Sequence, residues 1–89
     1  MYAIEFDSIV FKEGAAFVAY CPELDVSSCG TDLEQARRNL KTAVHLFIEE
    51  SEKMGTLSDI LEESGFVCTA TGAWQPPKIV ATELMKLAA

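Results

Sequence analysis

The sequence contains no long hydrophobic run. Its longest apolar stretch, "AAFVAYC" at residues 15–21, is far shorter than the roughly 18 residues that indicate a membrane-spanning helix. The first residues, "MYAIEFDS", carry acids where a signal peptide carries bases. The sequence therefore predicts no membrane span and no export signal, and we expect a cytoplasmic protein.

Basic residues are scarce. The 89 residues include 14 acids but only 7 Lys and Arg, which gives a formal net charge of −7. Phosphate backbones repel such a chain, so we expect no direct binding to nucleic acid. A basic protein is the natural electrostatic complement, although a net charge of this size also keeps a small domain soluble.

The chain also lacks a compact cysteine motif. Cys21 and Cys29 lie eight residues apart, and His45, the single histidine, is far from both. This spacing differs from that of zinc sites and redox pairs, and three cysteines form no disulfide framework. The glycines are scattered, so no phosphate-binding loop is predicted. We expect small apolar cysteines, a solvated His45 and no metal or cofactor.

Three acids leave one catalytic alternative open. Asp7, Glu23 and Asp25 could converge on Mg²⁺ from a strand and the loop that follows, as in a metal-dependent nuclease. Glu23 and Asp25 follow Pro22, however, and acids are common in turns for local reasons. The sequence favours solvated turn acids and a protein that is not an enzyme.

The remaining pattern predicts an α+β fold, with an antiparallel sheet of three to four strands packed against one long helix plus a short helix. Ile4, Phe6 and Val10 share one parity of the first strand, and the continuously apolar second strand is expected at the centre of the sheet. The length suffices for a single domain, 1–89, with a thin core that self-association would complete. Strands are predicted at residues 2–12, 15–20, 26–29 and 66–70, with turns at 12–14 and 71–74. In the tail, "KIVATE" favours a strand, predicted at 78–84, whereas "ELMKLAA" favours a helix.

The long helix has the clearest local signal. "TDLE" predicts a capping box with Thr31 as the N-cap and Glu34 at the third helical position. Gly55 is expected to end this helix, and "TLSDILEESG" at residues 56–65 predicts the short one. The apolar positions predicted to face the core are Leu33, Ala36, Leu40, Ala43, Val44, Phe47 and Met54, followed by Leu57, Ile60 and Leu61.

Acids gather around the end of the long helix and along the short one. Only Lys53 offsets them. They are either a solvated face or a docking surface for a basic protein. The predicted partner-binding residues are Glu49, Glu50, Glu52, Asp59, Glu62 and Glu63.

Residues 19–50 resemble the core of the HicB-like antitoxin family. That pattern has a strand, Pro-Glu-Leu, a short strand ending in Gly-Thr, and a long helix beginning Leu-Glu-Glu-Ala. The matching residues are Pro22, Glu23, Leu24, Gly30, Thr31, Leu33, Glu34 and Ala36. The preceding hairpin fits as well, so the resemblance covers about residues 2–50. The domain is predicted to have its core at residues 2–54, with a short helix and a C-terminal extension at residues 56–89.

The resemblance implies a β-β-β-α-β arrangement, described as a partial ribonuclease H-like fold. It also implies a protein that neutralises HicA, a small basic mRNA-cleaving toxin. Many such antitoxins add a helix-turn-helix or ribbon-helix-helix module that binds DNA. Here too little sequence follows Gly65, and Lys78 and Lys86 are its only bases. The alternative is a solitary HicB-like domain that forms a dimer or tetramer and binds another protein or a small ligand.

Overall fold

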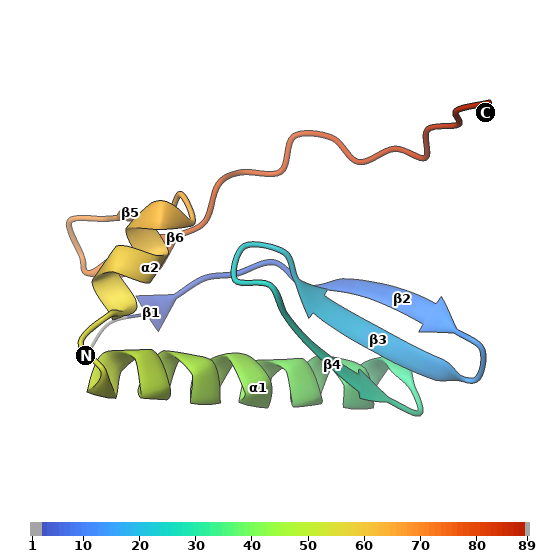
Figure 1. The fold of residues 1–89 in the computed structure, drawn as a ribbon, viewed down its shortest axis with the longest axis horizontal. Coiled ribbons are helices and arrows are strands. Elements are labelled where there is room, and N and C mark those ends of the chain that lie inside the picture. The colour runs from blue at the N-terminus through green and yellow to red at the C-terminus, as the bar shows by residue number, and fades with distance from the viewer. Residues whose placement is uncertain (1–2, 89) are drawn as a thin grey trace.

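The computed structural model describes residues 3–88 and confirms an α+β fold with one long and one short helix (Figure 1). One sheet has the strand order β2-β3-β4, and a smaller sheet has the order β1-β6-β5. The helices are α1 (Leu33–Lys53) and α2 (Leu57–Glu63); the strands are β1 (Ala3–Ile4), β2 (Ile9–Glu13), β3 (Ala16–Cys21), β4 (Val26–Gly30), β5 (Val67–Cys68) and β6 (Ala73–Gln75).

The antiparallel sheet forms because a tight hairpin brings β2 and β3 together. Glu13 pairs with Ala16, so the connecting turn is the two residues Gly14 and Ala15. The turn predicted at residues 12–14 is therefore wrong, because Lys12 and Glu13 belong to β2. Gly14 has φ +61°. Glycine adopts this left-handed conformation without steric cost. Strand β3 pairs with both β2 and β4. Its predicted central position is therefore confirmed.

The predicted single strand over residues 2–12 is divided into β1 and β2, and residues 5–8 belong to neither. The parity was predicted correctly, because Ile4, Phe6 and Val10 all pack against the core. Residue 2 lies outside the described residues. The break separates the two sheets, since β1 pairs in parallel with β6 whereas β2 pairs with β3.

The N-terminus of α1 lies one residue later than predicted. Asp32 is the N-cap, and its Oδ1 accepts from the Gln35 N–H at 2.7 Å. The Gln35 Oε1 in turn accepts from the Thr31 N–H at 2.7 Å. The predicted box of Thr31 and Glu34 is thus wrong, because a carboxylate at the positive helix end is a stronger acceptor than a hydroxyl.

The buried stripe of α1 is shorter than predicted. Ala36, Leu40 and Val44 are buried, as expected. Leu33 and Met54, in contrast, are 47% and 68% exposed. These two residues stand at the first helical position and at the C-cap, where α1 is no longer covered. The helix ends as predicted, with Gly55 at φ +73°.

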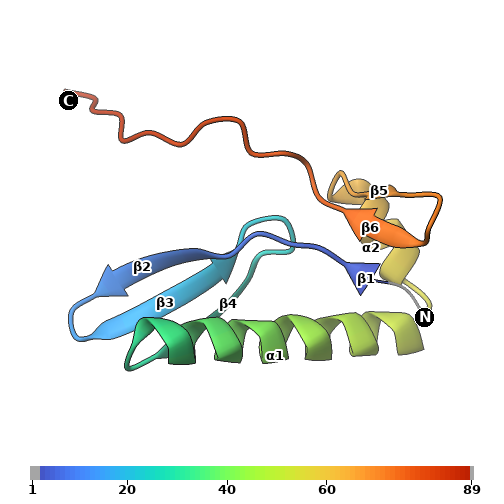
Figure 2. The ribbon, with the colours of Figure 1, turned by 180° about the vertical axis from the view of Figure 1, so that it is seen from behind.

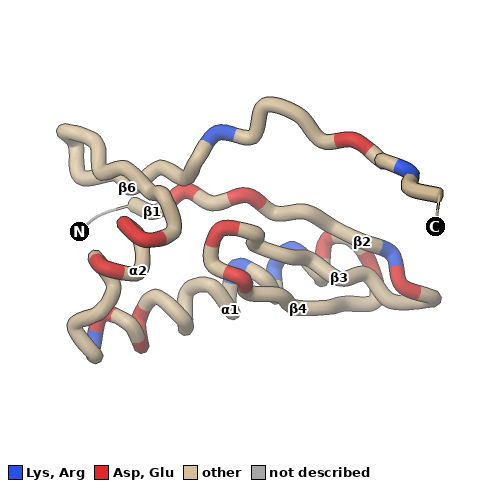
Figure 3. The backbone as a smooth tube through the Cα atoms, turned by 45° about the horizontal axis from the view of Figure 1, so that its top comes forward, with Lys and Arg blue, Asp and Glu red and all other residues tan. Residues whose placement is uncertain are grey.

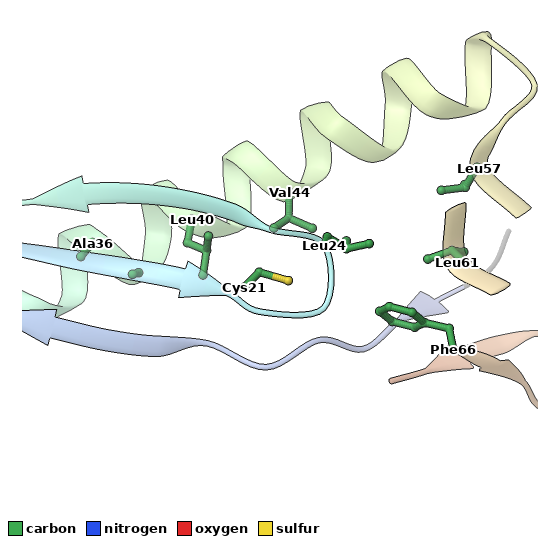
Figure 4. Packing of buried hydrophobic residues seen from close by; sticks show 9 residues of the cluster. Cys21, Leu24, Ala36, Leu40, Val44, Leu57, Leu61 and Phe66 are labelled. Atoms are coloured by element: carbon green, nitrogen blue, oxygen red, sulfur yellow. The ribbon is translucent and has the colours of Figure 1, made fainter. Parts of the chain in front are cut away.

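Helix α2 and the smaller sheet complete the core (Figure 4). Leu57 and Leu61 of α2 are buried, as predicted, and Phe66 joins them. Trp74 packs against this cluster from β6, so the predicted turn at 71–74 is wrong. The turn instead spans residues 69–72, and the Thr69 N–H donates to the Ala73 carbonyl at 2.7 Å. The buried cluster consists of Ala19, Cys21, Leu24, Ala36, Leu40, Val44, Leu57, Leu61 and Phe66.

Residues 78–88, which we call the C-terminal segment, contain no helix or strand. The strand predicted over 78–84 is therefore wrong. Pro76 and Pro77 follow β6 directly and have no N–H to donate, so the pairing of β6 with β1 cannot continue along the chain. Within residues 3–88, neither helix combines the length and apolar character needed to cross a bilayer.

Candidate interaction surfaces

The turn between β3 and β4 is a partly buried polar corner. The Glu23 carboxylate accepts from the Asp7 N–H at 3.1 Å and from the Cys21 thiol at 3.5 Å, both at its Oε1. Burial raises the pKa of the Cys21 thiol to about 11 and also raises the pKa of Glu23. Cys21 therefore stays protonated at neutral pH, which makes it a poor nucleophile.

The acids considered for a metal site serve this corner instead. Asp25 accepts from the Tyr20 hydroxyl at 2.9 Å, and this hydrogen bond raises the pKa of Tyr20. The Glu23 carboxylate is engaged by Asp7 through the backbone. Within residues 3–88, no three His, Cys, Asp or Glu side chains are grouped so that they could hold a metal ion. The geometry gives the nuclease alternative no support.

The residues that carry the family resemblance are partly packed and partly exposed. A Cβ at Gly30 would lie 2.6 Å from the backbone nitrogen of Ala36, so only glycine lets the end of β4 lie this close to α1. Ala36 is fully buried, and Leu24 is buried in the turn before β4, near Val44 (Figure 4). Glu34, in contrast, is exposed and pairs with Arg37 at 3.8 Å.

The predicted docking acids lie together at one end of the molecule. Figure 3 shows acidic positions along α2 and the C-terminal part of α1, with a basic position among them. All six of these residues are exposed. The Oε2 of Glu49 lies 3.4 Å from the Nε2 of His45. We call this set the acidic surface: Glu49, Glu50, Glu52, Asp59, Glu62 and Glu63. Its role in binding stays a prediction.

A second feature was not predicted from the sequence. An apolar groove of about 530 Å³ runs between the chain at β1 and the exposed side of α1. Ile4, Phe6, Val44 and Ile48 form its apolar lining, and its charged rim is Lys41, His45, Glu49 and Glu52. The residue that could have indicated the groove is Ile48. It is not among the predicted core positions, although it lies one helical turn beyond Val44, which is.

The groove exists because α1 is longer than the sheet that covers it. Its 21 residues span roughly 31 Å at 1.5 Å per residue. The sheet β2-β3-β4 lies along the N-terminal part, and α2 and β1 lie near the C-terminal end (Figures 1 and 2). The stretch between them, where residues 5–8 form no strand, leaves Ile4, Phe6 and Ile48 only half-buried.

Comparison with known proteins yields no relative. The chain matches no family model, no curated protein and no solved structure.

Proposed function

We propose that the chain is a HicB-like antitoxin, a non-enzymatic binding module that neutralises a small basic mRNA-cleaving toxin of the HicA type. The observation that carries this proposal is the acidic surface at the junction of α1 and α2, where six exposed carboxylates face solvent with Lys53 as the one base among them in the sequence. The resemblance of residues 19–50 to the HicB core supplies the kind of partner.

The mechanism we propose is electrostatic cover. A ribonuclease that binds RNA presents Lys and Arg side chains to the phosphate backbone. An acidic surface of complementary shape pairs with those basic side chains and excludes the RNA. The protein needs no cofactor for this role. The setting we propose is the cytoplasm, with no contact to a membrane and no direct contact to DNA.

The first test is isolation of the tagged full chain from its own host. A small basic ribonuclease at near-stoichiometric yield supports the proposal, whereas the absence of any such protein contradicts it. Binding to the recovered toxin is then measured for Glu62→Lys/Glu63→Lys, two positions on the acidic surface outside the groove. We expect at least tenfold weaker binding, about 1.4 kcal/mol or more, with an unchanged circular dichroism spectrum.

A matched control has the same change in net charge at the opposite end of the molecule. Glu13 lies at the tip of the β2–β3 hairpin and Glu34 in the first turn of α1 (Figure 1). Glu13→Lys/Glu34→Lys should bind the toxin nearly as tightly as the wild type. Equal weakening by both pairs would indicate a general charge effect and contradict the acidic surface as the docking site.

A second candidate is a solitary homo-oligomeric HicB-like domain of other function. The observation that favours it is the exposure of large apolar side chains in the C-terminal segment, such as Val80 at 89% and Leu87 at 91%. Recovery of the protein alone, as a discrete oligomer, would support this candidate over the antitoxin.

A further inference from the structure

The C-terminal segment exposes several large apolar side chains. Leu84 is 101% exposed, Val80 89% and Met85 81%. Soluble monomers rarely present large apolar patches to water unless the patch binds something. The segment is extended, and its residues make none of the hydrogen bonds found within residues 3–88.

The way the segment leaves the body keeps it away from its own groove. Pro77 packs closely on Gly65: a Cβ at Gly65 would lie 2.9 Å from the Pro77 Cγ. Consecutive prolines fix φ at both positions and restrict Pro76 to an extended conformation. The chain then runs on the side of β1 and β2 that is opposite to α1 (Figures 1, 2 and 3). The groove, in contrast, is bounded by α1.

We propose that the C-terminal segment of one copy lies in the apolar groove of a second copy of this chain. The groove offers what the segment needs, an apolar lining of Ile4, Phe6, Val44 and Ile48 between charged rims. The proposal deepens the second candidate function, homo-oligomerisation, and holds whether or not a toxin exists.

Charge complementarity favours a second copy as the occupant. Two of the seven bases but only one of the fourteen acids lie in residues 78–88, so the segment carries +1 while the remaining residues carry −8. The segment is thus a basic, apolar stretch on an acidic protein. The groove rim includes Glu49 and Glu52, which are suited to a basic segment.

The alternation of side chains decides which residues of the segment enter the groove. In an extended chain successive side chains point to opposite faces, so Glu83, Met85 and Leu87 share one face of the segment. When this face points into the groove, Met85 and Leu87 contact the apolar lining and Glu83 pairs with Lys41 on the rim. Leu84 and Lys86 then lie on the opposite face.

Reciprocal binding of the two segments forms a closed dimer. Each copy has one segment and one groove, so two copies related by a two-fold axis satisfy both. The dimer buries apolar side chains from both copies at two equivalent sites. No further copy is required, which predicts a dimer rather than an open chain of molecules.

Sedimentation equilibrium of the full chain tests the proposal. The wild type should be a dimer at micromolar concentration, and Met85→Ala/Leu87→Ala should raise the dimer dissociation constant at least tenfold. The matched control is Leu46→Ala/Val67→Ala, since Leu46 and Val67 are 59% and 67% exposed but lie outside both the segment and the groove. A monomeric wild type, or equal effects of both pairs, would overturn the proposal.

A charge exchange tests the alignment of the segment. Glu83→Lys should weaken the dimer severalfold, and Lys41→Glu in the same chain should restore it. Lys12→Glu, at a base on β2 outside the groove, should not. Restoration by both changes, or by neither, would contradict the proposed alignment. Because these changes leave the acidic surface intact, toxin binding by the same variants shows separately whether the antitoxin proposal fails.

Discussion

The body of the protein, residues 3–75, and the C-terminal segment differ in burial far more than in hydrophobicity. Seven of the eleven residues in the segment are apolar, against 49% in the whole chain. All eleven are nevertheless exposed, whereas the body encloses a continuous buried cluster. A high apolar content is therefore not sufficient to bury a segment. A surface must also be available on which the segment can pack.

The decisive difference lies at the junction of the two regions. Strand β6 is held by pairing with β1 and β5, and Trp74 packs against the core. Pro76 and Pro77 then remove two consecutive N–H donors. The chain cannot add to the sheet, so the next apolar residues, Ile79 and Val80, lie 45% and 89% exposed.

The largest expected difference in the free energy of unfolding is between a Leu→Ala substitution in the body and one in the C-terminal segment. Leu61→Ala leaves a cavity at a fully buried position, and we expect it to lower the free energy of unfolding by about 2–5 kcal/mol. Leu84→Ala removes a side chain that touches nothing within its own copy. We expect it to change the unfolding of the monomer by less than about 0.5 kcal/mol.

Urea titration measures both variants, at protein concentrations low enough to keep each monomeric. Dependence on protein concentration separates the dimer contribution from the stability of the fold. Similar losses of unfolding free energy for Leu61→Ala and Leu84→Ala at low concentration would show that the segment packs on its own body. That result would contradict the difference in burial between the two regions.

A smaller effect is expected from adding atoms instead of removing them. Gly30→Ala places a Cβ 2.6 Å from the backbone nitrogen of Ala36, so β4 and α1 must separate locally. We expect a loss of about 1–3 kcal/mol in the free energy of unfolding. Ala81→Val, in the exposed segment, adds two carbons and should cost almost nothing. If Gly30→Ala unfolds thermally at the same midpoint as the wild type, β4 and α1 can separate locally without loss of stability, and this prediction is wrong.

Much of the body could be predicted from its sequence because local and tertiary signals agree there. The alternation before Gly14 and the apolar run after it predict the hairpin, and the pairing of Glu13 with Ala16 is what a two-residue turn imposes. The period of α1 places Leu40 and Val44 in the core. In these elements each residue favours the same structure as its neighbours.

The errors arise where the outcome depends on distant partners. Gly72 predicts a turn that includes Trp74, yet packing on the core draws Trp74 into a strand. The β propensity of residues 78–84 predicts a strand, but propensity means little without a strand to pair with. Thr31 and Asp32 are both good N-caps, and a one-residue choice between them is decided by hydrogen-bond geometry.

The candidate sites divide in the same way. The acidic surface is visible in the sequence because exposed acids on consecutive helical turns need no tertiary information. The groove is not, because it depends on where the sheet stops along α1 and on the break at residues 5–8. Ile4 and Ile48 are 44 positions apart in the chain and line it together.

The last prediction concerns cysteine and is confined to alkaline solution. Cys21 is fully buried in the body, whereas Cys68 is exposed beside the turn after β5. Burial raises the pKa of Cys21 from 9.0 to about 11 in the folded state. Between these values the unfolded chain loses the thiol proton while the folded chain keeps it, so fewer protons are bound in the unfolded state. The linkage relation then requires stability to fall as pH rises.

Below pH 9 the Cys21 thiol is protonated in both states, so its contribution is fully present there and is lost progressively towards pH 11. We expect Cys21→Ala to show a shallower decrease of unfolding free energy over this interval than the wild type, and Cys68→Ala to follow the wild-type slope. Urea titrations at several pH values measure both slopes. Identical slopes for all three proteins would mean that the Cys21 thiol is accessible to water, and the packing assigned to the polar corner would then be wrong.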